Sequence, residues 1–233
     1  MNASAVRPVG AITIGCAAAC LCTASVRGDS SGLNNIPTAD TTSDRTIVFQ
    51  FKSVLSDESH SQYVSGFKMG LEPFGQRFEW GVDGRAGTRS IGEDAGPAVL
   101  QFKLALDVTE TTALGLGVAN IGLRERDRDD VGQAAKYAVF SHGFGSFRAH
   151  AGYSLQQNGN TVLLGLDTTM PLFDRDLVLR SDLIQIDDED QFLGSVGALY
   201  NLTDDLIVEA WVSQPFEHGE PTFTLKLNFA IKF

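Results

Sequence analysis

The last stretch of the chain, residues 222–233, alternates between apolar and polar side chains without interruption. The apolar side chains occupy the odd positions Phe223, Leu225, Leu227, Phe229, Ile231 and Phe233. The even positions carry the polar or small residues Thr222, Thr224, Lys226, Asn228, Ala230 and Lys232. A period of two is that of a β-strand whose two faces differ in polarity, and it excludes an amphipathic helix. We therefore predict a strand here, with one face that must be covered by apolar material.

The same alternation recurs along the chain from Arg45 onward. After the N-terminal stretch, no segment is apolar over the roughly 18 residues that a membrane-spanning helix requires. We instead predict roughly twelve strands, each about as long as a tilted strand must be to cross a bilayer. Their ranges are 46–54, 62–72, 77–85, 97–107, 112–121, 133–141, 146–156, 160–169, 176–186, 191–200, 206–214 and 222–233.

The connections between these segments alternate in length. Short turns join the second strand to the third, the fourth to the fifth, the sixth to the seventh, the eighth to the ninth and the tenth to the eleventh. Looser, more charged connections mostly fall between them. An antiparallel sheet in a soluble sandwich is the alternative for any single strand, but a sandwich has no reason to keep this odd–even order. A transmembrane barrel does keep it, with short turns at one end and longer loops at the other.

We therefore predict an all-β fold for residues 45–233, a closed antiparallel up-and-down transmembrane β-barrel. The final strand ends on an aromatic residue, and in this it resembles the C-terminal assembly signal of bacterial outer-membrane β-barrel proteins, with Phe229, Ile231 and Phe233 as signal residues. The resemblance implies a location in the bacterial outer membrane. It also implies two partners, the outer-membrane lipid and the barrel-assembly machinery. Aromatic residues near strand ends would lie at the membrane interfaces; the candidates are Trp80, Tyr63, Tyr137, Tyr153, Tyr200, Phe229 and Phe233.

The polar faces of the strands would line the lumen of such a barrel, because the apolar faces must meet lipid. Their positive and negative charges nearly balance. The candidates are Lys52, Lys68, Glu72, Glu79, Asp83, Arg85, Lys103, Asp107, Arg148, His150, Asp167, Arg180, Asp182, Glu209, Lys226 and Lys232. About twelve strands leave a lumen between that of eight strands, which side chains fill, and that of sixteen, which is open. Either ion pairs close this lumen, or it is a narrow porin-like channel for a small polar or charged solute.

The N-terminal residues 1–24 differ from the rest of the chain. One basic residue, Arg7, is followed by an apolar stretch and then by small residues up to Ala24, which is the pattern of a secretory signal peptide. A lipoprotein signal is the alternative. All three cysteines lie in this segment, so that its removal would leave no thiol; they are Cys16, Cys20 and Cys22.

Residues 25–44 are polar and contain Gly, Asn, Pro, Ser and Thr. This composition predicts a flexible periplasmic lead-in to the barrel without structure of its own. Within it, residues 32–39 are similar to a segment found ahead of the first strand in some outer-membrane barrel proteins.

Several other classes of function fit the sequence less well. The net charge of −11 argues against a nucleic-acid partner. No Cys/His spacing for zinc and no phosphate-binding glycine loop occurs, so we expect no metal and no cofactor. A non-conducting barrel that displays its surface loops is one alternative to a channel.

A membrane-embedded lipid-modifying enzyme is the other alternative. One family of outer-membrane phospholipases also has twelve strands, with a His and a Ser two residues apart on one strand. Neither His142 nor His150 is followed by a Ser at that spacing. His150, with Arg148 and Ser154 on the same strand face, is the remaining cluster, and a lone His on a polar face is more often a hydrogen-bonded lining residue. We therefore expect a channel without catalytic residues.

Overall fold

The structure is a computed structural model that describes residues 31–56, 62–86, 97–124, 134–155, 160–186, 191–217 and 219–233. The predicted signal peptide, residues 1–24, and residues 25–30 of the predicted lead-in lie outside these ranges. A 3-10 turn, η1, spans Pro73–Gly75. The strands are β1 Thr46–Leu55, β2 Gln62–Leu71, β3 Arg77–Ala86, β4 Ala98–Thr109, β5 Thr112–Gly122, β6 Ala135–Gly143, β7 Arg148–Leu155, β8 Thr161–Leu172, β9 Arg175–Ile186, β10 Gln191–Asn201, β11 Leu206–Pro215 and β12 Thr222–Lys232.

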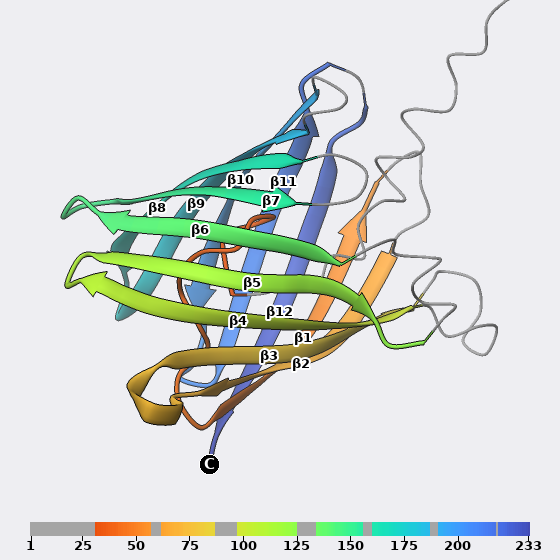
Figure 1. Cartoon of the computed structure of the whole chain (residues 1–233). Helices are drawn as coiled ribbons and strands as arrows, with labels where there is room; N and C mark the ends of the chain where they lie inside the picture. Colours follow the sequence, from red (N-terminus) through yellow and green to blue (C-terminus); the bar gives the residue numbers. More distant parts are fainter. Residues whose placement is uncertain are drawn as a thin grey trace, which may run out of the picture.

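These strands form one closed antiparallel barrel in which each strand pairs with its neighbours in the chain (Figure 1). The ring closes where β1 pairs with β12, from Thr46↔Lys232 to Leu55↔Phe223. Every strand is therefore paired on both sides, and no edge is left to associate with another sheet. The predicted fold class is confirmed, and the strand order β1 to β12 sets the strand number at twelve.

The connections at one end of the barrel are short, and we call this the tight-turn end. They comprise residues 72–76, 110–111, 144–147, 173–174 and 202–205. At this end β1 begins and β12 stops, and the N–H of Phe233 donates to the carbonyl of Arg45 at 2.9 Å. The connections at the opposite end, the loop end, are mostly longer: 56–61, 87–97, 123–134, 156–160, 187–190 and 216–221. The predicted alternation of short and longer connections is thus confirmed.

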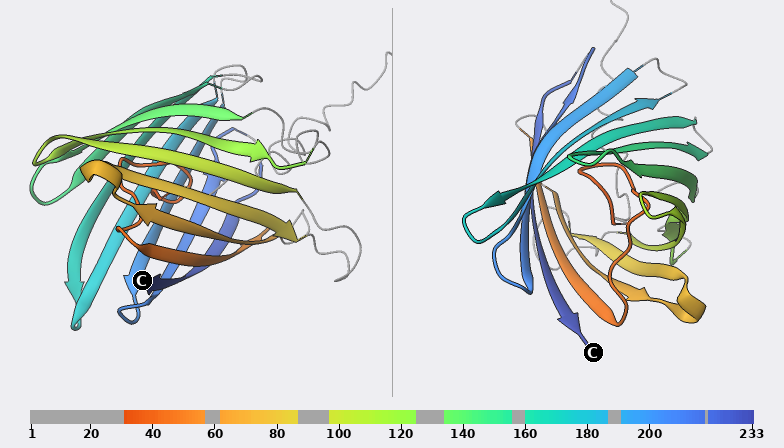
Figure 2. Two further views of the ribbon diagram at one scale, coloured as in Figure 1. Left: turned by 60° about the horizontal axis from the view of Figure 1, so that its bottom comes forward. Right: turned by 90° about the vertical axis from the view of Figure 1, so that its left-hand side faces the viewer.

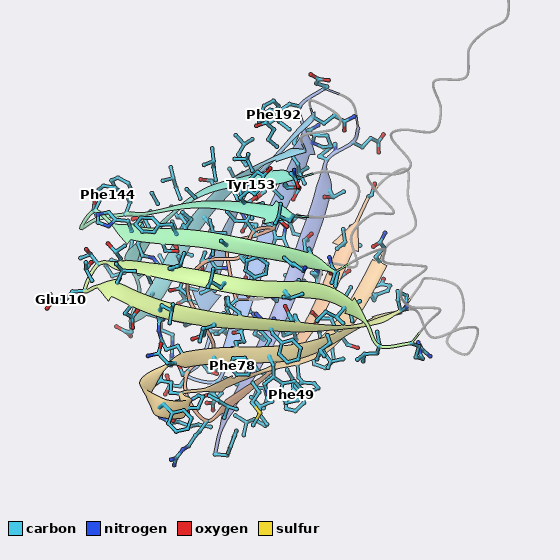
Figure 3. All side chains as sticks on the ribbon, viewed as in Figure 1. Phe49, Phe78, Glu110, Phe144, Tyr153 and Phe192 are labelled. Carbon is cyan, nitrogen blue, oxygen red and sulfur yellow. The ribbon has the colours of Figure 1, made fainter. Side chains whose placement is uncertain are left out.

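The outer surface of the barrel is apolar, because alternate residues of each strand point outward. On β1, Phe49 and Phe51 are 40% and 58% exposed, whereas Gln50 between them is 4% exposed. Figure 3 shows Phe49 and Tyr153 on the outer side of the wall. Such a continuous apolar outer surface is unusual for a soluble monomer, which rarely exposes an apolar patch larger than a few hundred Å². The same alternation on β12 buries the inward-facing residues Thr224, Lys226 and Asn228.

Inside, the wall also carries some apolar residues. Ala119 of β5 packs with Tyr137 and Val139 of β6 in one buried cluster. The prediction that Tyr137 lies at a membrane interface is therefore wrong, because Tyr137 belongs to the inward-facing set of β6 and is 7% exposed. A second apolar cluster, centred on Ile184 of β9, lies farther along the lumen wall.

Residues 31–44, which we call the plug, begin inside the barrel and end at its tight-turn rim, where Ser43 is exposed (Figure 2). The prediction of a lead-in without its own structure is therefore wrong for these residues. The chain reverses direction between Gly32 and Pro37, which form an isolated antiparallel bridge. Ile36 is 2% exposed and Ala39 is 1% exposed. The plug is ordered because its polar groups and its few apolar side chains find partners on the lumen wall, as described next.

Candidate functional site

The lumen wall at β3 and β4 carries a buried ion pair. Glu79 and Lys103 lie directly opposite each other in the strand register, with 3.8 Å between Lys103 Nζ and Glu79 Oε1. Both side chains are almost completely buried. Beside them, the amide of Gln101 donates to Asp83 at 3.1 Å. A buried ion pair is stable only when further hydrogen bonds satisfy its remaining donors and acceptors.

A larger polar network lies on β1, β9, β11 and β12. Arg180 Nη1 is 2.7 Å from Glu209 Oε2, and Lys226 Nζ is 3.5 Å from Glu209 Oε1. Asn228 donates a hydrogen bond to Glu209 and lies 3.0 Å from the amide of Gln50. On this side of the lumen, the charges form ion pairs with one another.

A third polar group connects β6, β7 and β8. Arg148 donates two hydrogen bonds to Asp167, at 3.0 and 2.7 Å. His150 lies between Asp167, 3.3 Å from its Nε2, and Ser141, whose Oγ is 2.8 Å from its Nδ1. Bidentate pairing of a guanidinium with a carboxylate gives both strength and geometric specificity. Arg148 therefore fixes Asp167, and Asp167 in turn helps to orient His150.

The predicted lining residues divide by burial. Arg148, Arg180 and Lys52 are partly buried. The side chain of Arg85 lies outside the described residues. Those that are buried in the wall are Lys68, Glu79, Asp83, Lys103, His150, Asp167, Asp182, Glu209 and Lys226.

Three predicted lining residues do not reach the lumen. Glu72, Asp107 and Lys232 are exposed at the tight-turn end. They follow the alternation of their strands in sequence, but they lie where the strands end at the rim, so that water surrounds them. Asp107 forms an ion pair there with Arg77 of β3.

The first residue of the plug binds the wall at β3 and β4. Ser31 donates hydrogen bonds from its N–H, at 2.9 Å, and from its hydroxyl to Glu79. The ammonium of Lys103 donates to the carbonyl of Ser31 and, at 3.3 Å, to that of Thr38. The plug thereby supplies the hydrogen bonds that the buried Glu79–Lys103 pair requires.

The turn of the plug contacts the opposite wall. Asn34 donates to Ser195 of β10 at 2.9 Å. The N–H of Asn35 donates to Asp182 of β9 at 2.8 Å, and its amide donates to Ser213 of β11 at 3.0 Å. In the order of the ring, β9 and β10 lie across from β3 and β4. The plug therefore spans the lumen from one side to the other.

The plug then returns toward the tight-turn end. The N–H of Ala39 donates to Ser141 of β6 at 3.0 Å. The N–H and hydroxyl of Thr42 donate to Glu79 at 2.7 and 2.8 Å. Glu79 thus binds both the first residues and the last residues of the plug, which closes the plug into a loop across the lumen.

Asp40 is the charged contact of the plug. One carboxylate oxygen is 2.9 Å from Arg148 Nη1, and the other accepts the hydroxyl of Thr38 at 2.9 Å. Burial alone would raise the pKa of Asp40, but the charge of Arg148 and the hydrogen bonds from Arg148 and Thr38 outweigh it. The pKa of Asp40 therefore lies below its ordinary value, and the carboxylate is ionised at neutral pH.

Two apolar side chains of the plug enter the second apolar cluster of the wall. Leu33 and Ile36 pack with Leu163 of β8 and Ile184 of β9. Gly165 of β8 makes room for them, since a Cβ atom at this position would lie only 2.3 Å from Leu33 Cδ1. An apolar patch within a charged lumen is thus covered by the plug.

Two further glycines of the wall lie against the backbone of the plug. A Cβ atom at Gly70 of β2 would lie 2.1 Å from the carbonyl oxygen of Thr42. A Cβ atom at Gly115 of β5 would lie 3.1 Å from Ala39 Cα. Side chains at these positions would displace the backbone of the plug.

None of the plug residues that enter the lumen was predicted from the sequence. A signal was present in Leu33 and Ile36, two large apolar residues in an otherwise polar segment, together with glycines in strand interiors, which often mark close backbone approach.

Within the described ranges, no helix is long and apolar enough to cross a membrane. In the same ranges, no group of three His, Cys, Asp or Glu side chains is arranged to hold a metal ion.

No protein-family model matches the chain, and no curated protein matches its sequence. Solved structures do match its fold. The KdgM porin aligns with a TM-score of 0.56 and 6% identity, over 78% of this chain and 98% of that chain. The KdgM porin in complex with disordered oligogalacturonate gives the same TM-score and coverage at 7% identity. The NanC porin aligns with a TM-score of 0.52 and 10% identity, again over 78% of this chain and 98% of that chain. At such identities the likeness is one of fold, so we conclude that the chain has the barrel fold of these porins.

Proposed function

We propose that the protein is a bacterial outer-membrane β-barrel that acts as a narrow porin-like channel for small polar or charged solutes. The observation that carries this proposal is a closed ring of strands with apolar residues outside and charged residues inside. In lipid, a closed barrel satisfies every backbone hydrogen-bonding group within the ring. A polar lumen then offers a polar solute a route across the bilayer.

The lining supports a solute of mixed or modest charge. Both signs occur close together in the lumen, as in the pairs Glu79–Lys103 and Glu209–Arg180. Such a lining does not select one sign of charge, and it can bind donor and acceptor groups of one small molecule. The KdgM structure with oligogalacturonate supports a polar solute for a barrel of this fold.

The surroundings of the protein follow from the same proposal. The exposed apolar side chains contact outer-membrane lipid. Residues 1–24 direct secretion through the inner membrane, and the tight-turn end faces the periplasm. The exposed side chains of Phe229, Ile231 and Phe233 on the last strand are available to the barrel-assembly machinery.

A lumenal hydrolase is the second candidate, and one observation favours it. Ser141, His150 and Asp167 form a hydrogen-bonded chain of the residue types found in hydrolase triads. In this chain, however, Ser141 Oγ already accepts the N–H of Ala39, and Arg148 binds both oxygens of Asp167. A nucleophile must be open to its substrate, so we favour the channel. Hydrolysis of lipid or ester substrates that Ser141→Ala and His150→Ala abolish, with the barrel still folded, would favour the enzyme.

Ion conductance across planar lipid bilayers tests the channel. The protein is extracted from membranes in detergent, and its folding is checked by the gel shift that heating produces in folded barrels. We expect discrete conductance steps, and uptake of small sugars and amino acids into liposomes, from the protein or from a variant that lacks residues 31–42. A non-conducting barrel for surface display gives neither. Absence of steps and of uptake in both folded proteins would overturn the proposal.

A further inference from the structure

We propose that the plug, residues 31–44, is an intramolecular ligand that closes the channel, and that solutes pass only after the plug has left the lumen. This inference rests on the proposed channel function. It assigns the lumenal faces of β2 to β11 as a binding site whose occupant is a segment of the same chain.

The plug blocks the lumen because it crosses the full width of the barrel. Its first residue binds Glu79 on β3, and its turn binds Asp182 on β9, on the opposite side of the ring. The charged residues that would face a solute are in the same places. With the plug in position, Glu79, Lys103 and Asp182 are at most 5% exposed. A solute therefore cannot reach these side chains unless the plug moves.

The wall is built to receive the plug. Gly70 on β2, Gly115 on β5 and Gly165 on β8 are each placed where a Cβ atom would meet a plug atom at 3.1 Å or less. Gly143, also on the inward-facing side of β6, has no such neighbour, since the nearest atom to a Cβ there is 3.8 Å away. Glycines on three separate strands thus leave space for the plug. A lead-in segment that had entered the lumen by chance would not require glycine at these positions.

The contacts of the plug are of a kind that water and solute can replace. Many are hydrogen bonds to polar side chains of the wall, and the apolar cluster that the plug joins takes in two of its side chains, Leu33 and Ile36. The root of the plug is attached where the chain enters β1. Glu72 donates its N–H to Asp44 at 2.9 Å, and the chain enters β1 through Arg45 in a left-handed conformation, φ 51°. We therefore infer that residues 31–43 move out through the tight-turn end while Asp44 stays in place.

A reversible disulfide between the plug and the wall tests the closure directly. Because the N–H of Ala39 donates to Ser141 Oγ at 3.0 Å, the Cα atoms of these residues are at most about 7 Å apart, near the limit for a disulfide. We expect the double variant A39C/S141C to lose conductance when oxidised and to regain it in dithiothreitol. The single variants A39C and S141C, treated in the same way, should show no such change. Equal conductance of the oxidised and reduced double variant, with the bond verified by mass spectrometry, would overturn the proposal.

Variants that add a side chain to the wall at the plug provide a second test of the closure. G70A together with G165A places Cβ atoms into the plug, and G143A is the matched control, where a Cβ atom makes only ordinary van der Waals contacts at 3.8 Å or more. We expect the double glycine variant, like deletion of residues 31–42, to conduct severalfold more than the wild type. The control G143A should conduct like the wild type. Both readouts use barrels whose folding is verified by the heat-dependent gel shift.

The outcomes separate the two proposals. If wild type and deletion variant conduct equally, the channel stands and the closure by the plug is wrong. If the deletion variant conducts and the wild type is silent or nearly so, both proposals stand. If no folded variant conducts or takes up solute, the channel function fails, and the closure fails with it.

Discussion

Asp40 of the plug and Arg148 of β7 form an ion pair, with 2.9 Å between the carboxylate oxygen and Nη1. Their side chains are 42% and 43% exposed, so solvent screens the pair. Arg148 also binds Asp167, which remains its partner when Asp40 is removed. The pair therefore joins a movable segment to a fixed wall residue at modest free energy, on the order of 1 kcal/mol or less for an exposed pair.

Replacing Asp40 by Asn should shift the plug toward release. A loss of about 1 kcal/mol or less changes the ratio of released to seated plug by at most about fivefold. We expect the open probability in planar bilayers to rise by up to that factor, while the single-channel conductance of the open state stays the same. The matched control is Asp204→Asn, a carboxylate at the tight-turn end that pairs with Arg175 outside the lumen. An unchanged open probability in D40N would show that this ion pair does not help to seat the plug.

Acid should release the plug. Asp40 has a lowered pKa when the plug is seated and its ordinary value, near 3.8, when the plug is free. The stabilisation is therefore fully present above about pH 3.8 and is lost as the pH falls through the lower pKa of the seated state. The groups that face Asp40 are Arg148, which stays charged, Asp167, which Arg148 holds, and Lys103.

Open probability measured between pH 7 and pH 3 checks this prediction. We expect wild type to open increasingly below about pH 4, with a smaller rise in D40N because other carboxylates of the lumen still titrate. Identical pH profiles for the two proteins would assign the acid response to those other carboxylates.

Removing the apolar contact of the plug should weaken its seating more than removing its ion pair. Leu33→Ala with Ile36→Ala deletes two buried side chains that pack on Leu163 and Ile184. Each such truncation in a packed site costs about 2–5 kcal/mol, less where water can fill the space. We expect the double variant to be mostly open at neutral pH, with unchanged heat resistance of the barrel. Leu123→Ala, at an exposed position, is the control. A variant that stays closed would show that the hydrogen bonds of the plug suffice.

The barrel could be predicted from the sequence because each strand carries its own signal. Period-two alternation, as between Phe49, Gln50 and Phe51, is a local property that the ring preserves. Turn signals then fixed the order of short and longer connections. The alternation within the strands and the turn signals between them predict the same barrel, and such agreement is the condition for a sequence to specify a fold.

The plug could not be predicted in the same way, because its structure depends on contacts distant in sequence. In the sequence, Asn34 and Asn35 resemble loop residues. Their hydrogen-bond partners Ser195 and Asp182 are distant in sequence and lie next to them only in the folded barrel. The same limit explains Asp107, which alternation assigned to the lumen although it lies at the rim. Alternation gives the face on which a side chain lies but not its depth along the barrel.

The Glu209 network should be essential for barrel stability. Glu209 accepts from Arg180 and lies 3.5 Å from Lys226, and the side chains of both partners are largely buried. Glu209→Gln leaves buried positive charges without their counter-ion, which costs about 3–5 kcal/mol in buried sites. We expect the temperature at which the folded band disappears in the gel-shift assay to fall clearly. In the apolar double variant Glu209→Leu with Arg180→Met this temperature should fall less, because only Lys226, and not Arg180 as well, then loses the carboxylate of Glu209. A temperature unchanged in E209Q would mean that water already reaches this network.

A charge on the outer face should impair insertion, whereas one on the rim should not. Leu227 lies in β12 between the inward-facing Lys226 and Asn228, and it is 41% exposed on the apolar surface. Arginine on the lipid face of a barrel costs about 2–4 kcal/mol near the middle of the bilayer and about 0–1 kcal/mol near its edges. We therefore expect Leu227→Arg to reduce the yield of folded, heat-modifiable barrel in lipid vesicles severalfold. Leu202→Arg, in the turn between β10 and β11, should fold like the wild type. Equal folding of the two variants in vesicles, or wild-type protein that stays monodisperse in buffer without detergent, would contradict a lipid-facing outer surface and with it the membrane location.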